Sequence, residues 1–137
     1  MAVIKTENLS YVYGEGTPFR KVAVDNVNLE IEEGEFVGVI GHTSSGKSTL
    51  IQHFNGLLQP SSGKIYIDSE ELWQDKSRLR PIRFKVGLVF QYPEYQLFEE
   101  TVYKDIAFGP KNMGLDDGEI DKRIRETIRL VGLSENV

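Results

Sequence analysis

The chain lacks cysteine, a surplus of basic residues and any long apolar run. Without cysteine, disulfide bridges and thiolate metal sites are excluded, which suits a reducing cytosol. No apolar stretch approaches the roughly 20 residues that cross a bilayer, and the N-terminal MAVIKTENLSY has no signal-peptide core. The net charge of −5 argues against broad nucleic-acid binding, because phosphate contacts need an excess of lysine and arginine. These absences predict an aqueous globular protein, and 137 residues fit one domain.

Five apolar segments are predicted to be strands, and they fall into two kinds. Residues 2–13 are rich in β-branched and aromatic residues and enter a turn, while 24–31 and 64–68 alternate apolar and polar residues. Alternation is typical of a half-buried antiparallel strand. Residues 36–41 and 86–90 contain no polar side chain, which predicts strands buried on both faces.

Three segments have helical periodicity. The first begins at Lys47, where apolar residues recur at spacings of three and four until QPSSGK interrupts them. Thr101 is predicted to cap a second helix that runs to about Phe108, before Gly and Pro. Asp116 and Glu119 have the spacing of a capping box for a third helix. We expect that helix to bury an apolar stripe and to end at Gly132; the stripe consists of Ile120, Ile124, Ile128 and Val131.

The sequence GVIGHTSSGKSTL, residues 38–50, matches the phosphate-loop pattern G-x-x-x-x-G-K-[ST]. It follows a predicted strand and opens a predicted helix, which is the context that the motif requires. Gly41 and Gly46 allow the backbone N–H groups to converge on an anion at the positive end of the helix. Lys47 would reach the β- and γ-phosphates and Ser48 would coordinate Mg²⁺. The candidate phosphate-binding residues are Gly41, Ser44, Ser45, Gly46, Lys47, Ser48 and Thr49.

Two histidines lie near the motif without the partners that a catalytic base needs. His42 occupies a variable position of the loop and has no carboxylate or second histidine close by in sequence to orient it. His53 is most simply a surface or packing residue of the helix. Neither residue is therefore a candidate for catalysis.

Several stretches together resemble the nucleotide-binding subunit of ABC transporters, and within them the ATPase subunits of energy-coupling factor (ECF) transporters. GHTSSGKSTL with NGLLQPSSGKIYID is similar to the Walker A region, and LVFQ at 88–91 to the Q-loop. The following YPEYQLFEETVYKDIAFGPKNMGL resembles the vitamin- and metal-uptake branch. The resemblance implies an α/β fold: a P-loop NTPase core with an N-terminal antiparallel β portion and the start of a helical subdomain. It divides the chain into 1–91, with Walker A and the Q-loop, and 92–137.

Two further site residues follow from this resemblance. Tyr13 would stack on adenine, because a tyrosine ring offers its face to any base; Tyr11 is the competing candidate, and Tyr13 is preferred for its place just before the turn at Gly14. Gln91 would be the Q-loop glutamine, a catalytic residue and Mg²⁺ ligand, and residues 92–98 would face a membrane partner.

The chain departs from the family pattern in three places. Ser44 and Ser69 stand where the family usually has glycine, which matters if the backbone there needs a positive φ. After VGLSENV the family would continue with its signature motif, a Walker B strand and a catalytic glutamate, and no apolar run ending in Asp-Glu occurs in these 137 residues. We therefore expect the N-terminal half of a fold that is incomplete without the C-terminal half, binding nucleotide better than it hydrolyses it.

The resemblance implies an ATP-binding and hydrolysing subunit that energises uptake of a vitamin or metal ion, with ATP and Mg²⁺ as cofactors. Its partners would be a second ATPase subunit, related or identical, a membrane coupling subunit and a substrate-binding membrane component, at the cytoplasmic face of the membrane. The alternatives are a soluble P-loop kinase and a non-catalytic nucleotide-binding module. The transported substrate and the choice between homodimer and heterodimer stay open at this point.

Overall fold

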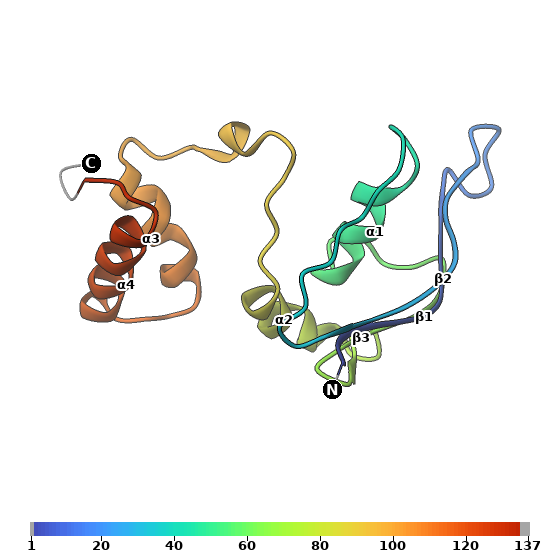
Figure 1. Cartoon of the computed structure of the whole chain (residues 1–137), viewed down its shortest axis with the longest axis horizontal. Coiled ribbons are helices and arrows are strands. Elements are labelled where there is room, and N and C mark those ends of the chain that lie inside the picture. Colours follow the sequence, from blue (N-terminus) through green and yellow to red (C-terminus); the bar gives the residue numbers. More distant parts are fainter. Residues whose placement is uncertain (1, 135–137) are drawn as a thin grey trace. The chain divides into compact units, whose positions relative to one another are not determined.

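The computed structural model describes residues 2–134, which form parts of two compact units, Met1–Leu88 and Val89–Val137. The first unit contains a four-stranded antiparallel sheet in the order β2-β1-β3-β4; Figure 1 labels β1, β2 and β3. Its strands are β1 (Ala2–Tyr13), β2 (Lys21–Glu32), β3 (Ser62–Ile67) and β4 (Glu70–Glu71). The three alternating or β-rich segments are thus strands, as the sequence predicts.

The pairing of β1 with β2 contains an irregularity that a polar side chain accommodates. Between the pairs Thr6–Leu29 and Leu9–Val27, β1 has one more residue than β2, and Asn8 in this bulge has a φ of 50°. The Thr6 hydroxyl is buried there, where it donates to the Val27 carbonyl at 3.0 Å and accepts from the Leu29 N–H at 3.1 Å. The hydroxyl thereby satisfies two backbone groups beside the bulge.

Helix α1 (Lys47–Phe54) contacts β2 and β3, and α2 (Leu79–Lys85) follows a 3₁₀ turn, η1 (Lys76–Arg78). The alternation along β3 places Ile65 and Ile67 in the core, while Tyr66 belongs to the other face of the sheet. Ile82 of α2 joins the same core. The core of the first unit consists of Leu9, Val24, Ile65, Ile67, Leu72 and Ile82.

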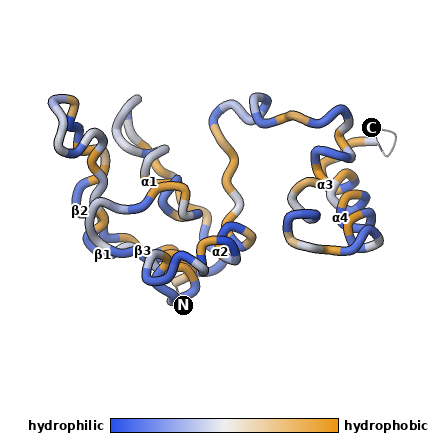
Figure 2. Tube along the Cα trace, turned by 180° about the vertical axis from the view of Figure 1, so that it is seen from behind, coloured by the Kyte–Doolittle hydropathy of each residue, from blue (hydrophilic) through white to orange (hydrophobic). Residues whose placement is uncertain are grey.

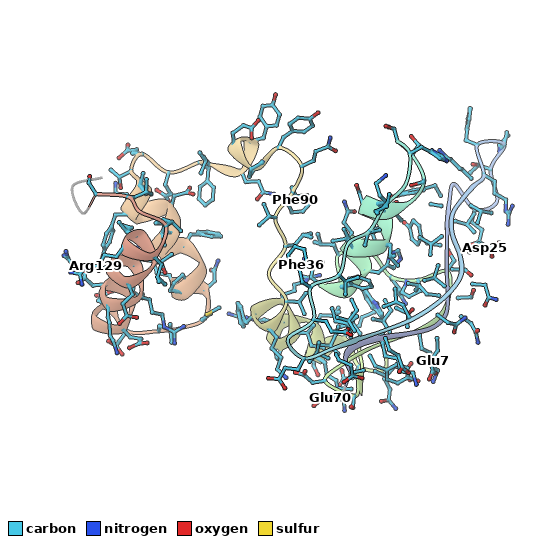
Figure 3. All side chains as sticks on the ribbon, in the orientation of Figure 1. Glu7, Asp25, Phe36, Glu70, Phe90 and Arg129 are labelled. Carbon is cyan, nitrogen blue, oxygen red and sulfur yellow. The ribbon has the colours of Figure 1, made fainter. Side chains whose placement is uncertain are left out.

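The two segments predicted as fully buried strands are not strands. Residues 36–41 and 86–90 lie outside every ladder of the sheet. Phe36 and Ile40 are almost fully exposed and Val89 is 81% exposed; Figure 3 shows Phe36 and Phe90 on segments drawn as loop, and the trace is apolar there (Figure 2). The prediction is wrong because it rested on composition, whereas a strand needs a neighbouring backbone to bond, and within residues 2–134 neither segment pairs with one.

The second unit contains a 3₁₀ turn, η2 (Pro93–Gln96), and two packed helices, α3 (Val102–Asn112) and α4 (Asp117–Leu130). The Thr101 hydroxyl accepts from the Lys104 N–H at 3.2 Å, so the predicted cap of α3 is confirmed. The predicted end at Gly109 is wrong, because the helix continues through Pro110. Proline removes one N–H donor, but the final turn still closes through bonds from the residues that follow it.

Helix α4 follows its predicted cap and stripe with two differences. Asp116 accepts from the N–H groups of Gly118 and Glu119 at 3.0 and 3.1 Å, but the reciprocal half of the capping box does not form. The Glu119 carboxylate instead bonds Arg123 at 2.7 Å. Val131 is 64% exposed, contrary to expectation, because it lies past the last helical turn. The predicted stripe is otherwise buried; the core here is Ala107, Ile120, Ile124 and Ile128.

Helices α1, α3 and α4 end in the same hydrogen-bonded closure around a glycine with positive φ. After α3, the N–H of Leu115 bonds the Pro110 carbonyl at 3.3 Å and the N–H of Gly114 bonds the Lys111 carbonyl at 2.9 Å, which is a Schellman motif. Gly56 and Gly132 occupy the same position after α1 and α4. The sequence prediction identified only Gly132. None of the helices found over residues 2–134 combines the length and apolar character of a membrane span.

Candidate phosphate-binding site

The loop between residue 41 and α1 is shaped by a glycine pressed against a strand. Gly46 has a φ of 93° and immediately precedes the first residue of α1, Lys47. A Cβ at this position would collide with the carbonyl oxygen of Ala23 on β2. Only glycine meets both conditions, since the left-handed conformation disfavours a side chain and the close backbone approach leaves no room for one. The second glycine of the motif therefore seats the loop on the sheet.

Ser44 adopts the backbone conformation that made its departure from glycine matter. Its φ is 66°, in the left-handed region, and Ser69 has a φ of 68° in the turn between β3 and β4. A serine accepts this conformation at a cost on the order of 1 kcal/mol or more. The loop therefore has the left-handed backbone conformation at Ser44 even without glycine, at the cost of some backbone strain.

The Lys47 ammonium is directed at the loop itself. Its Nζ donates to the carbonyl oxygens of Gly41 and His42, each at 2.7 Å, and lies 3.3 Å from the Ser45 hydroxyl. These contacts hold the side chain curled over the loop that precedes it by five and six residues. An anion seated in the loop would compete for the same ammonium, and the bond to an anion is the stronger because both of its partners are charged.

The start of α1 presents backbone donors beside the ammonium. The first intrahelical bond runs from the Leu50 N–H to the Gly46 carbonyl at 2.8 Å. The N–H groups of Lys47, Ser48 and Thr49 precede it and have no acceptor within the helix. These N–H groups lie at the positive end of the helix dipole, so the start of α1 favours an anionic ligand.

A pocket of about 230 Å³ opens at this loop. Its wall includes two residues of β2, Lys21 and Ala23, which the sequence reasoning did not identify because a strand position carries no motif. Gly41, a predicted site residue, is not among the lining residues; its carbonyl accepts from Nζ of Lys47, which lines the pocket. The remaining lining residues are Tyr13, Ser44, Ser45, Gly46, Lys47, Ser48 and Thr49.

Tyr13 is one of the residues that line this pocket. It ends β1 and is 42% exposed, and its hydroxyl lies 3.1 Å from the Thr49 hydroxyl. Tyr11, the alternative candidate, does not line the pocket; its ring packs against the hydrophobic core and against His53. Of the two tyrosines, the geometry favours Tyr13 as the one that meets a ligand.

The histidines and Gln91 lie as follows. His53 is completely buried in α1, so the packing interpretation fits, and burial holds its pKa below the usual value. His42 is exposed, with Nδ1 2.7 Å from the Thr43 carbonyl. Gln91 and Tyr92 are exposed residues of the second unit, ahead of η2, and Gln91 is not among the residues lining the pocket.

Comparison with known proteins identifies the family to which the chain belongs. The sequence pattern of the ABC transporter family matches residues 24–136, which is most of the chain. The chain therefore belongs to the ABC transporter family, whose α/β fold class is the one that the sequence predicts.

Within that family the chain is similar to the energy-coupling factor transporter ATP-binding protein EcfA2 of Acetivibrio thermocellus. The two are 62% identical over 134 residues, which are 98% of this chain and 47% of the relative. The chain thus spans about half the length of the curated relatives that it matches. The resemblance to the ATPase subunits of ECF transporters that the sequence carries is confirmed.

Two solved structures have the same fold. The structure of cbiO1 from Clostridium perfringens, part of the ABC transporter complex cbiONQ, is 38% identical with a TM-score of 0.81, covering 97% of this chain and 51% of that one. The ATP-binding cassette MJ0796, in a dimeric post-hydrolysis state bound to ADP and Pi, is 32% identical with a TM-score of 0.82, covering 96% and 58%.

Proposed function

We propose that the chain binds Mg²⁺-ATP in the pocket between Tyr13 and the phosphate loop, as part of an ATPase subunit that energises uptake by an ECF-type ABC transporter. One observation carries the proposal: a tyrosine and the loop Ser44–Thr49 line a single pocket. An aromatic ring and a phosphate cradle are the two parts that a nucleoside triphosphate requires.

The proposal assigns roles to the loop, to Tyr13 and to Gln91. The Lys47 ammonium exchanges its bonds with the Gly41 and His42 carbonyls for the β- and γ-phosphate oxygens. The N–H groups at the start of α1 bind the phosphates, and the Tyr13 ring supports the base. Ser48, which lines the pocket, and Gln91 are the proposed Mg²⁺ ligands. Bound Mg²⁺ would neutralise charge that develops on the phosphates.

Hydrolysis needs more than these residues provide. The 137-residue sequence contains no apolar run that ends in Asp-Glu, and thus no group of the Walker B type to anchor Mg²⁺ and orient water. We infer that this chain binds ATP and does not turn it over alone, whereas the whole ATPase subunit does. The proposed transported substrate of the whole transporter is a vitamin or a metal ion.

The proposed partners follow from the relatives. EcfA2 of Acetivibrio thermocellus is named as a transporter ATP-binding protein, and cbiO1 of Clostridium perfringens is part of the complex cbiONQ. We therefore propose a second ATPase subunit, an integral membrane coupling subunit and a substrate-binding membrane component, with the chain at the cytoplasmic face of the membrane. The exposed residues 92–98 are the proposed contact to the membrane partner.

The test is a calorimetric titration of the chain with Mg²⁺-ATP beside Lys47→Ala. We expect at least about tenfold weaker binding in the variant, because a charge-assisted contact to the phosphates is lost. Lys64→Ala is the matched control, since this lysine pairs with Glu71 on the sheet. Equal affinity of Lys47→Ala and wild type, with both folded by circular dichroism, would disprove phosphate binding at this loop.

Two further measurements separate the alternatives. Co-purification of the chain with an integral membrane protein supports the transporter subunit over a soluble P-loop kinase. Phosphate release by the isolated chain would contradict the inference that it binds ATP without turnover.

A further inference from the structure

Four residues form a closed ring of contacts between β1 and α1. The Tyr13 and Thr49 hydroxyls are 3.1 Å apart, and the Thr49 carbonyl oxygen lies 2.6 Å from Nδ1 of His53. The His53 ring packs on Tyr11 with centroids 4.9 Å apart, and Tyr11 packs on Tyr13 at 4.8 Å, both edge to face. Each member thus touches two others, and a rotamer change of Tyr11, Tyr13 or His53 would break two of these contacts. Thr49 uses its side-chain hydroxyl for one contact and its backbone carbonyl for the other.

The ring has two members at the pocket and two behind it. Tyr13 and Thr49 line the pocket, whereas His53 has no exposed surface and Tyr11 packs against the core of the first unit. The pair behind the pocket, a half-buried tyrosine and a buried histidine, therefore anchors the pair that lines it. This matters because Tyr13 is 42% exposed, and a side chain that exposed would otherwise be free to rotate.

The anchoring histidine has one defined hydrogen bond. A carbonyl can only accept, so the imidazole donates from Nδ1 to Thr49. Nε2 is buried and has no partner within the described part of the chain. An uncharged ring tolerates this position, whereas a second N–H there would be buried without an acceptor. The histidine thus acts as a packing ring with one bond to the helix that carries Thr49.

We propose that Tyr11 and His53 are positioning residues that hold the Tyr13 ring in place for a nucleobase. The inference rests on the proposed function of the pocket. An edge-to-face contact with Tyr11 covers at most one face of the Tyr13 ring, which leaves the other for stacking. The bond between the Tyr13 and Thr49 hydroxyls ties the base end of the pocket to the phosphate loop. Holding the ring beforehand lowers the ordering cost that binding would otherwise carry.

The experiment compares two ligands that differ in the base. Mg²⁺-ATP and Mg²⁺-tripolyphosphate are titrated against the chain and against Tyr11→Leu, Tyr13→Phe and Lys47→Ala. Tyr11→Leu removes the ring behind Tyr13, and Tyr13→Phe keeps the stacking face but removes the tie to Thr49. Tyr66→Phe is the control, since it removes a hydroxyl from a tyrosine on the other face of the sheet, where it bonds Glu7.

We expect Tyr11→Leu to weaken ATP binding roughly fivefold and to leave tripolyphosphate within about twofold, since an aromatic pair contributes about 1 kcal/mol. Tyr13→Phe should show the same selectivity with a smaller loss, roughly threefold, on the scale of one hydrogen bond.

The outcomes that overturn the inference are distinct from those that overturn the proposed function. Equal losses for ATP and tripolyphosphate in Tyr11→Leu, or no loss, would show that the ring supports the fold alone. Tyr13→Phe, which keeps its aromatic packing, decides the question if Tyr11→Leu fails to fold. If Lys47→Ala binds both ligands as wild type does, the proposed function fails, and the inference fails with it.

Discussion

The paired strands of the sheet and the two apolar runs at 36–41 and 86–90 have similar residue types but differ in structure. Leu9 of β1 is fully buried, whereas Phe36 is fully exposed. Both stretches are rich in residues that favour strands, so composition does not separate them. The difference is that β1 has β2 and β3 beside it, and the apolar runs have no partner strand within residues 2–134. Strand propensity therefore acts only where a neighbouring backbone is present.

The largest expected effect tests this comparison directly. Leu9→Ala should lower the free energy of unfolding by about 3 kcal/mol, because it empties a fully buried site. Phe36→Ala should change it by less than about 0.5 kcal/mol, because the ring is in solvent. Urea denaturation of both variants gives the two values. A loss of similar size at Phe36 would mean that its segment is buried in solution.

A second pair of substitutions compares Gly46, which packs against β2, with Gly38 in the unpaired run 36–41. Gly46→Ala should destabilise the chain by about 2 kcal/mol, since φ is 93° and the methyl group would meet the Ala23 carbonyl. Gly38→Ala, in the unpaired run, meets nothing within 4 Å and should be nearly neutral. Thermal unfolding of the two proteins measures the difference. If both substitutions cost the same, the loop is not seated on β2.

The pH dependence of the free energy of unfolding tests the burial of His53 in α1, the helix that packs on the paired strands. Burial lowers the pKa of His53 below its ordinary 6.5, so below about that pH the unfolded chain binds more protons than the folded one. Stability from this residue is therefore present above pH 6.5 and declines as the pH falls toward the depressed pKa. We expect His53→Leu to show a shallower loss of unfolding free energy between pH 7 and 5 than wild type, in urea titrations. If the free energies of unfolding of wild type and His53→Leu changed in parallel with pH, the pKa of His53 would be the same in the folded and unfolded chains.

The smallest expected effect concerns backbone strain at the end of the sheet. Ser69→Gly should stabilise the chain by about 0.5 kcal/mol, because φ is 68° in the turn between β3 and β4. Ser77→Gly, within the 3₁₀ turn η1, should instead destabilise it slightly. The melting temperatures of the two variants should move in opposite directions. A lower melting temperature for Ser69→Gly would show that its side chain contributes more than its backbone strain costs.

Local patterns predicted most of the secondary structure, because their causes are local. The cap at Thr101, the cap at Asp116 and the alternation along β2 each depend on residues within a few positions. The continuation of α3 through Pro110 was missed because the closure around Gly114 outweighs the loss of one donor near the helix end. The Glu119 side chain was misassigned because Arg123 offers a charge one turn away.

The residues of the candidate site also fall into those that the local sequence predicted and those that it did not. The phosphate-loop residues were recognisable from spacing, since the backbone path of the loop depends on its own glycines. Lys21 and Ala23 at the pocket wall were not, because they come from a strand more than 20 residues away in sequence. His53 gave no sign of its contact with Tyr11, which exists only because α1 lies on the sheet.

The sequence alone determined the phosphate-loop motif, the helix caps and the alternating strands, because these follow from steric and hydrogen-bonding preferences of neighbouring residues. Only the tertiary structure decided which apolar segments pair and how Tyr11, Tyr13, Thr49 and His53 close into a ring. Both outcomes depend on contacts between elements distant in sequence, which no local pattern encodes.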